Sequence, residues 1–258
     1  MAQTNYRTTD ELVHDGLPLR EILAKHQQWL DTGRQLGKRA DLRGADLSGA
    51  DLHGVNLFRA QLEDASLEEA DLREANLAGA SMDHANLAEA KLTAADLTKA
   101  TLTAANLMRA NLNDAVLKEA NLHGAWLRYA RLRGASLAAA DLSEAHLDHA
   151  DLHHADLFKT KLREAHMSYA NLRTANLGMA DLSAAQLSSA VLALANLSGA
   201  TLGGCRLDKA DLVHANLSGA NLVGARMLTP SQLAAAITNE DTVLPGGSRG
   251  PAPSLVRR

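Results

Sequence analysis

A period of five residues dominates the chain. From Ala40 onward the sequence reads ADLRG ADLSG ADLHG, and this rhythm runs without insertion or deletion through 38 pentapeptides to residue 229. The central residue of each unit, position i, is Leu in 35 units and Met in the other three. Position i−2 is Ala in 35 units, and position i−1 is Asp or Asn in 21. Any fold for this chain must explain the repeat before anything else.

The period excludes a helical repeat. Each residue turns an α-helix by about 100°, so a five-residue step scatters the Leu side chains around the cylinder. In extended backbone, residues two apart face the same way. Ala at i−2 and Leu at i then point inward, i−1 points outward, and i+1 and i+2 form a bend, where Gly occupies i+2 in ten units. Such a unit buries its Leu only by stacking on copies of itself, so the pattern predicts a β-solenoid.

The A-(D/N)-L-x-x units resemble those of the pentapeptide repeat family, over residues 40–229. The resemblance implies an all-β solenoid, a right-handed quadrilateral β-helix in which four pentapeptides make one coil. The repeats then form about 9.5 coils and, at a strand spacing of roughly 4.8 Å, a rod about 45 Å long. Asp or Asn at i−1 is expected to form hydrogen bonds with nearby backbone at the bend.

The flanking segments are expected to cover the unpaired edges of the solenoid. Within residues 1–39, apolar residues at helical spacing predict an amphipathic capping helix over about 18–31. The segment Thr229-Pro230-Ser231-Gln232 predicts a helix start with a capping box, opening a C-terminal capping helix and extension over 230–244. The Pro- and Gly-rich residues 245–258 are expected to form a disordered tail.

Composition and motifs argue against several classes of function. The balance of 26 Lys and Arg against 30 Asp and Glu argues against direct nucleic-acid binding. The one cysteine, Cys205, occupies an inward Ala position and is expected to be a buried, inert thiol. The chain contains no phosphate-binding loop, nucleophile elbow or HExxH pair, so we expect neither an enzyme nor a bound cofactor. No apolar run is long enough for a membrane span, and no secretory signal is evident, so a cytoplasmic, bacterial protein is expected from the habits of the family.

Residues 20 apart become vertical neighbours in a four-sided coil, and the outer columns then gather an aromatic, Arg- and His-rich patch. Such a patch is a candidate surface for an acidic or π-rich partner, because Trp, Tyr and Arg dominate binding hot spots. The alternative is that outward positions vary freely and the rings share a face by chance. The candidate patch consists of Trp126, Arg128, Tyr129, Arg131, Arg133, His146, His149, His153, His154, His166, Tyr169 and Arg173.

The histidines also raise the question of a metal. His146 and His166 are expected to lie one strand spacing apart, with His149 beside them. Imidazole suits Zn or Ni, but no cysteine or fixed carboxylate completes a ligand set in the sequence. The sequence therefore predicts solvated surface histidines and no metal site.

Charge is uneven along the repeats. Residues 40–119 contain 14 acidic and 7 basic side chains, a net charge of −7, whereas residues 120–229 have a net charge of +1. Some family members that protect DNA gyrase or topoisomerase IV from quinolones present a DNA-like acidic rod, so the resemblance leaves a DNA-mimicking topoisomerase-binding protein as an alternative. A solvated face explains the same charges. The candidate acidic patch consists of Glu63, Asp64, Glu68, Glu69 and Glu74.

Two features weigh against the topoisomerase alternative: no central position holds Phe, and no loop interrupts the repeats. The sequence as a whole predicts a non-catalytic, rigid protein-interaction scaffold. Its partner is expected to be another protein, and its oligomeric state is either a monomer or an end-to-end dimer.

Overall fold

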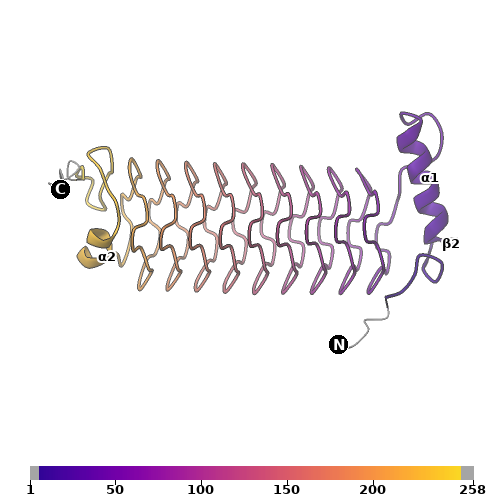
Figure 1. Cartoon of the computed structure of the whole chain (residues 1–258), viewed down its shortest axis with the longest axis horizontal. Coiled ribbons are helices and arrows are strands. Elements are labelled where there is room, and N and C mark those ends of the chain that lie inside the picture. Colours follow the sequence, from indigo (N-terminus) through magenta and orange to yellow (C-terminus); the bar gives the residue numbers. More distant parts are fainter. Residues whose placement is uncertain (1–5, 251–258) are drawn as a thin grey trace.

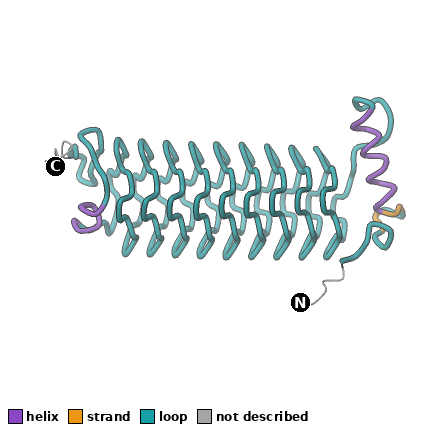
Figure 2. Tube along the Cα trace, viewed as in Figure 1, coloured by secondary structure: helices purple, strands orange, loops and turns teal. Residues whose placement is uncertain are grey.

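The computed structural model describes residues 6–250, and the repeats form a long rod with the N-terminal segment at one end and the C-terminal segment at the other (Figure 1). Successive coils pair through single-residue parallel bridges between residues 20 apart, from Asp41 with Gln61 to Arg206 with Arg226. Twenty residues are four pentapeptides, so each coil has four sides. Because each bridge is one residue long, the repeats carry no named strand and are drawn as loop (Figure 2).

Leu and Ala fill the interior of the rod, as the period of five predicts. Every repeat centre from Leu42 to Leu222 is at most 2 % exposed. Burying each Leu contributes roughly 1.5–3 kcal/mol, and the interior repeats this contribution coil after coil. The exceptions are also accommodated: the buried Thr160 Oγ1 donates a hydrogen bond to the carbonyl oxygen of Leu137 at 2.9 Å, and Cys205 is fully buried.

Each corner is a tight turn closed by a backbone hydrogen bond, and at many corners a side chain supports it as well. In the first corner, Ala45 N donates to the carbonyl oxygen of Leu42 at 3.1 Å. The i+2 residues from Gly44 to Gly224 have φ between 53° and 71°, the left-handed region of a type II turn, which explains the frequent Gly there. The Asp or Asn at i−1 supports the corner as predicted, as when Asn196 Oδ1 accepts a hydrogen bond from Ser198 N at 3.1 Å.

The last pentapeptide departs from the pattern. The sequence predicts Met227 as an inward centre, but its side chain is 63 % exposed and its own φ is 60°. The reason lies two residues on, where Thr229 adopts extended backbone, with φ of −86°, as the N-cap of a helix. A left-handed corner therefore cannot form at residue 229, and the last buried centre is Leu222.

A hairpin and a helix precede the repeats. Strands β1 (Val13–His14) and β2 (Leu17–Pro18) pair antiparallel across a two-residue turn, and helix α1 (Leu19–Asp31) follows directly. The helix buries Leu19, Ile22 and His26.

These N-terminal residues contact the open edge of the first coil. Arg7 pairs in parallel with Ala50, and Ala40 N donates to Nδ1 of the buried His26 at 3.1 Å. Burial lowers the pKa of His26 below its usual value of 6.5, which keeps this nitrogen available as an acceptor.

The C-terminal segment continues the pairing beyond the last coil. Helix α2 (Pro230–Ala235) begins with the predicted capping box between Thr229 and Gln232, and Gln232 Nε2 also donates to the carbonyl oxygens of Leu207 and Ala210. Further on, Ile237 pairs with Asn216 and Val243 pairs with Asn221, both in parallel.

Ordered structure extends further than the sequence predicts. Residues 245–250, expected to begin a disordered tail, return along the C-terminal segment: Val243 pairs antiparallel with Arg249, and Gly250 N donates to the carbonyl oxygen of Thr242 at 2.7 Å. Backbone pairing holds this short turn despite its Pro and Gly content. The rest of the expected tail, 251–258, lies outside the described residues. Neither helix in residues 6–250 has the length and apolar character needed to cross a membrane.

Candidate partner-binding face

The candidate patch centres on one side of the rod, the side whose interior residues include Leu127, Leu147 and Met167. We call this side, together with the corner that follows it, the aromatic face. Each coil presents an outward i−1 residue on the side itself and two residues at the corner. Because successive coils are in register, residues in the same position form columns along the rod.

The first column is a stack of three rings. Trp126 and His146 have ring centroids 4.2 Å apart with an interplanar angle of 14°, and His146 and His166 follow at 4.7 Å and 30°. Parallel bridges join the backbones of both pairs. The backbone ladder therefore sets the ring spacing, and Trp126 remains 45 % exposed.

The second column is a stack at the corner. Tyr129, His149 and Tyr169 lie with successive ring centroids 4.9 Å apart and ring planes nearly parallel, at 9° and 1°. All three residues have φ of 61°, so each ring projects from a left-handed corner. Tyr129 is 47 % and Tyr169 59 % exposed, and the stack is open to solvent.

Charged groups lie between the two stacks. The Arg128 guanidinium lies 5.9 Å from the Tyr129 ring centroid, and its Nε lies 4.0 Å from Oδ2 of Asp148. Burial lowers the pKa of His146 below its usual value of 6.5, the neighbouring His166 lowers it further, and Asp148 acts in the opposite direction. The imidazole of His146 is therefore mostly neutral at pH 7.

The remaining patch residues form a separate cluster at the next corner. His153 and His154 have ring centroids 3.9 Å apart, and their Nδ1 atoms lie 2.8 Å from the carbonyl oxygen of Arg173 and 2.7 Å from Thr174 Oγ1. Arg133 and both histidines line a shallow depression. Arg131 and Arg173 are exposed on the same side. The predicted patch thus consists of two clusters on adjoining sides of the rod, as the 20-residue register predicts.

The candidate acidic patch does not form one face. Its five residues occupy three successive corners of the rod: Glu63 and Asp64 at the first, Glu68 and Glu69 at the second, and Glu74 at the third. Two of them have side-chain partners, since Glu68 accepts from Asn86 Nδ2 at 3.1 Å and Glu74 lies 3.9 Å from His53. The acidic residues therefore spread over three of the four corners near the N-terminal end of the rod.

Sequence reasoning missed the role of Asp148. Its Oδ1 accepts a hydrogen bond from Ser168 N, on the next coil, at 3.2 Å. The backbone N–H at that position normally binds an Asp or Asn two residues earlier, where this chain has His166. A signal was available, because Asp83 and Asn113 likewise accept from Thr103 N and Arg133 N twenty residues on. In each case the next coil has no Asp or Asn at i−1, and an acidic or amide residue at i+1 of the preceding coil accepts the backbone hydrogen bond instead.

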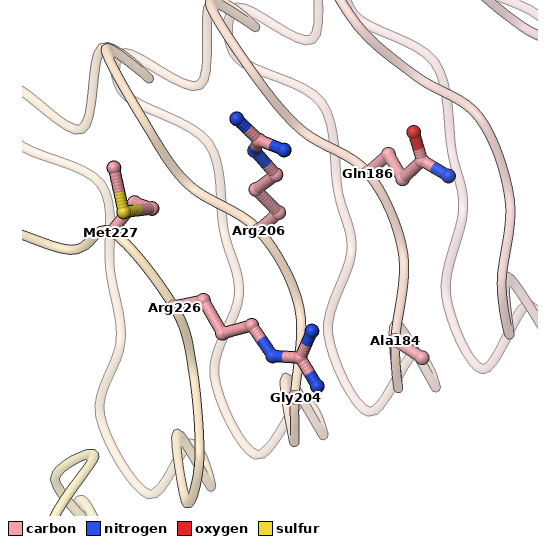
Figure 3. Close-up of a pocket in the computed structure, with 6 residues that line it drawn as sticks. All are labelled: Ala184, Gln186, Gly204, Arg206, Arg226 and Met227. Atoms are coloured by element: carbon pink, nitrogen blue, oxygen red, sulfur yellow. The ribbon is translucent and has the colours of Figure 1, made fainter.

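A second feature that the sequence did not reveal lies toward the C-terminal end of the same side. Arg206 and Arg226 continue the column of Trp126 and line a depression with Gln186 (Figure 3). Arg206 Nε donates to Asp208 Oδ1 at 2.6 Å. The column thus changes from rings to guanidinium groups near the end of the rod.

Comparison with known proteins agrees with the repeat. A family described as pentapeptide repeats matches in eight overlapping copies from residue 38 to residue 227. Among solved structures, HetL of Nostoc sp. strain PCC 7120, involved in heterocyst differentiation regulation, is 30% identical, with 87% of this chain and 97% of that chain covered and a TM-score of 0.44. No curated protein matches significantly.

Two further solved structures are less similar in sequence or in coverage. QnrB1, a plasmid-mediated fluoroquinolone resistance protein, is 18% identical, with 73% of this chain and 82% of that chain covered and a TM-score of 0.45. A pentapeptide repeat protein from the thylakoid lumen of Arabidopsis thaliana is 26% identical, with 43% and 74% covered and a TM-score of 0.35.

Proposed function

Because the chain belongs to the pentapeptide repeat family, we propose that it is a non-catalytic scaffold whose aromatic face binds another protein. The observation that carries this proposal is the pair of exposed ring stacks, Trp126–His146–His166 and Tyr129–His149–Tyr169. Large rings at the centre of an interface supply most of its binding energy.

The rings lie on a backbone that needs no reorganisation. Leu147 N donates to the carbonyl oxygen of His166 at 2.6 Å, and His146 N donates to that of Ala125 at 2.9 Å. The backbone that carries the rings is therefore already fixed in the free protein, which lowers the conformational entropy lost on binding a partner. Arg128, beside the rings, adds a positive charge that favours an acidic or aromatic partner surface.

In this proposal the terminal segments cap the rod. Arg7 and α1 occupy the first edge, and α2 with the bridges at Ile237 and Val243 occupies the last. Unpaired edges attract other strands, so covering them leaves the sides of the rod as the surfaces for recognition.

The proposal is tested by replacing the three large rings. The variant Trp126→Ser/Tyr129→Ser/Tyr169→Ser is compared with Phe158→Ser/Met179→Ser, which removes exposed apolar groups from the opposite side. In affinity capture from the source cell, we expect proteins retained by the wild type and by the control variant to be lost from the ring variant. Identical capture by all three chains would refute the proposal.

A DNA-mimicking topoisomerase-binding protein is the second candidate, motivated by the acidic corners from Glu63 to Glu74. It predicts that the protein restores gyrase supercoiling in the presence of a fluoroquinolone. It also predicts that charge neutralisation of Glu68, Glu69 and Glu74, not loss of the rings, abolishes the effect. Protection that depends on these carboxylates would replace the first proposal.

A further inference from the structure

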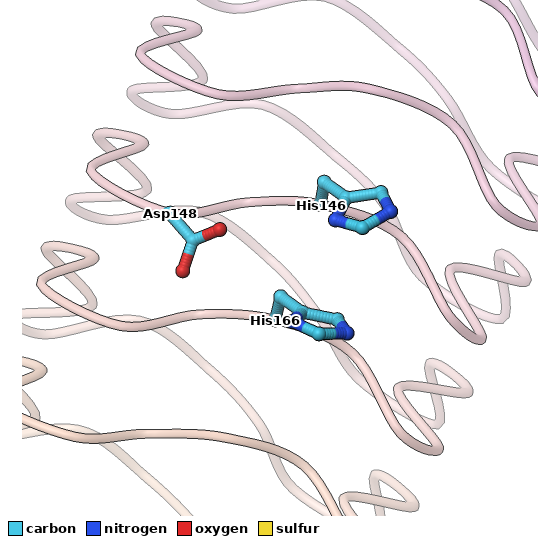
Figure 4. A group of neighbouring side chains, drawn as sticks. All are labelled: His146, Asp148 and His166. Atoms are coloured by element: carbon cyan, nitrogen blue, oxygen red, sulfur yellow. The ribbon is translucent and has the colours of Figure 1, made fainter.

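Three metal-ligating side chains meet on the aromatic face (Figure 4). One ligand atom from each of His146, Asp148 and His166 lies within 4.8 Å of the other two. We propose that these residues bind one divalent transition-metal ion of the Zn²⁺ class. Two imidazole nitrogens and a carboxylate oxygen form a donor set that Zn²⁺ accepts, and water completes the coordination in such three-ligand sites.

The two imidazoles are held in place while their nitrogens stay free. The backbones of His146 and His166 are bridged to each other, and Trp126 stacks on the far side of the His146 ring. Within residues 6–250, neither ring forms a hydrogen bond with another protein group. A neutral imidazole with a free lone pair is the form that binds a metal.

The carboxylate is fixed from the coil that carries His166. Ser168 N donates to Oδ1 of Asp148 at 3.2 Å, which directs the carboxylate toward that coil. The second oxygen, Oδ2, lies 4.0 Å from Nε of Arg128. From the sequence alone no carboxylate was expected to be fixed beside these histidines, and the hydrogen bond from Ser168 N fixes this one.

Holding an ion requires the three ligand atoms to move closer together. Donors that share one tetrahedral Zn²⁺ at its usual bond lengths lie roughly 3.3 Å apart. The ligand atoms now lie within 4.8 Å of one another, so binding requires both imidazoles to turn out of their stack until their in-plane lone pairs converge on the ion. All three residues are half-buried, so the ion enters directly from solvent.

Two neighbouring features supply sharp controls. The Arg128 guanidinium competes with a cation for Asp148, so its removal should strengthen metal binding. The nearby His153 and His154 form a histidine pair of similar closeness, but their Nδ1 atoms already lie at hydrogen-bond distance from Arg173 O and Thr174 Oγ1. If histidine content alone determined Zn²⁺ binding, the His146–His166 and His153–His154 pairs would contribute equally. The proposed site predicts that only the His146–His166 pair contributes.

The test uses the full-length chain without a histidine tag, with Zn²⁺ as the probe in isothermal titration calorimetry. We expect one ion per chain. His146→Asn, Asp148→Asn and His166→Gln should each weaken binding at least roughly tenfold, while Arg128→Gln should tighten it and His153→Gln/His154→Gln should leave it unchanged. Asn and Gln already occupy this column at Asn106 and Gln186, and Asp148→Asn retains an oxygen that can accept from Ser168 N, so the variants should fold.

Co²⁺ provides a second readout that depends on no variant. Co²⁺ added to the wild-type chain should give the intense visible absorption of a four-coordinate nitrogen and oxygen site. Absence of that band, absence of stoichiometric Zn²⁺ binding, or equal loss in the His153→Gln/His154→Gln control would overturn the proposal. Because these measurements use the chain alone, their failure leaves the partner-binding proposal intact.

Discussion

The aromatic face and the side opposite it share one backbone but use the outward i−1 position in different ways. On the opposite side, which we call the amide face, this column contains Asp156, Asn176, Asn196 and Asn216. Each amide nitrogen donates to the residue one coil earlier, at 2.9, 2.9 and 3.3 Å. Each side-chain oxygen also accepts from a backbone N–H two residues on, as in the bond from Ser218 N to Asn216 at 3.1 Å.

On the aromatic face the same column begins in the same way and then changes. Asn106 accepts from Met108 N at 3.1 Å and donates to Asn86 at 2.9 Å. From Trp126 to His166 the rings supply neither bond. The comparison shows that the Leu and Ala interior holds the coil whichever residue stands at i−1. Three successive positions are thereby released from supporting a corner and can present side chains for binding.

The largest expected effect concerns the interior, where the two faces should not differ. Leu147→Ala, beneath the aromatic face, and Leu157→Ala, beneath the amide face, should each lower the free energy of unfolding by about 2–5 kcal/mol, because both side chains are fully buried. Urea denaturation followed by circular dichroism measures this. A loss below about 1 kcal/mol at either site would show that the interior is not packed as described.

The next effect should separate the faces. Asn196→Ala removes bonds to Ser198 N, Asn176 and Asn216, and should lower the free energy of unfolding by about 1–2 kcal/mol. The matched variant Gln186→Ala changes the same position on the aromatic face and should alter stability by less than about 0.5 kcal/mol. Equal losses from the two variants in urea denaturation would remove the distinction between the faces.

Acid should weaken the corners that carboxylates support. Burial raises the pKa of Asp71, but hydrogen bonds from Arg73 outweigh it and hold that pKa below its usual value of 3.8. Ser183 does the same for Asp181. A pKa depressed in the folded state stabilises the protein above pH 3.8, and this contribution disappears as pH falls through the folded-state value.

We therefore expect the thermal midpoint to be flat near neutral pH and to fall below about pH 4. Asp71→Asn should start from a lower midpoint and lose less on acidification. A wild-type midpoint that rises between pH 4 and pH 2.5 would contradict the assignment.

The smallest expected effect concerns Cys205, whose buried thiol should not react in the native protein. Burial raises the pKa of the Cys205 thiol to about 12, so almost no thiolate forms at pH 8. Ellman's reagent should release no colour from the native chain and one equivalent after denaturation in guanidinium. Rapid reaction of the native protein would mean that the interior opens near the C-terminal end.

Much of the rod could be predicted because burial follows directly from the period. In extended backbone, Leu at every fifth residue can be buried only inside a solenoid. The 20-residue register then places Trp126 beside His146 and Tyr129 beside His149. The Asp and Asn residues at i−1 were predicted to support the corners for the same reason. Each of these inferences follows from the five-residue period and the regular stacking of the coils.

Other features of the structure could not be predicted, because the repeat does not determine them. Met227 keeps the period but loses its inward position, because the helix that follows decides the backbone at Thr229. The hairpin at the N-terminal end is signalled locally by Asp15-Gly16, a pair typical of two-residue turns, but its docking depends on tertiary contacts. The hydrogen bond of Asp148 crosses from one coil to the next, so predicting it required combining the 20-residue register with the missing Asp or Asn at position 166.

If the rings of the aromatic face serve binding, they occupy positions where Asp or Asn would stabilise the rod better. The most direct test is the free energy of unfolding of Trp126→Asn/His146→Asn, measured beside the wild type in urea. Two restored corner acceptors and a continuous amide column from Asn106 should outweigh the lost ring stacking, and we predict a gain of about 1 kcal/mol. A loss as large as that of Asn196→Ala would show that the rings support the rod, and would contradict the claim.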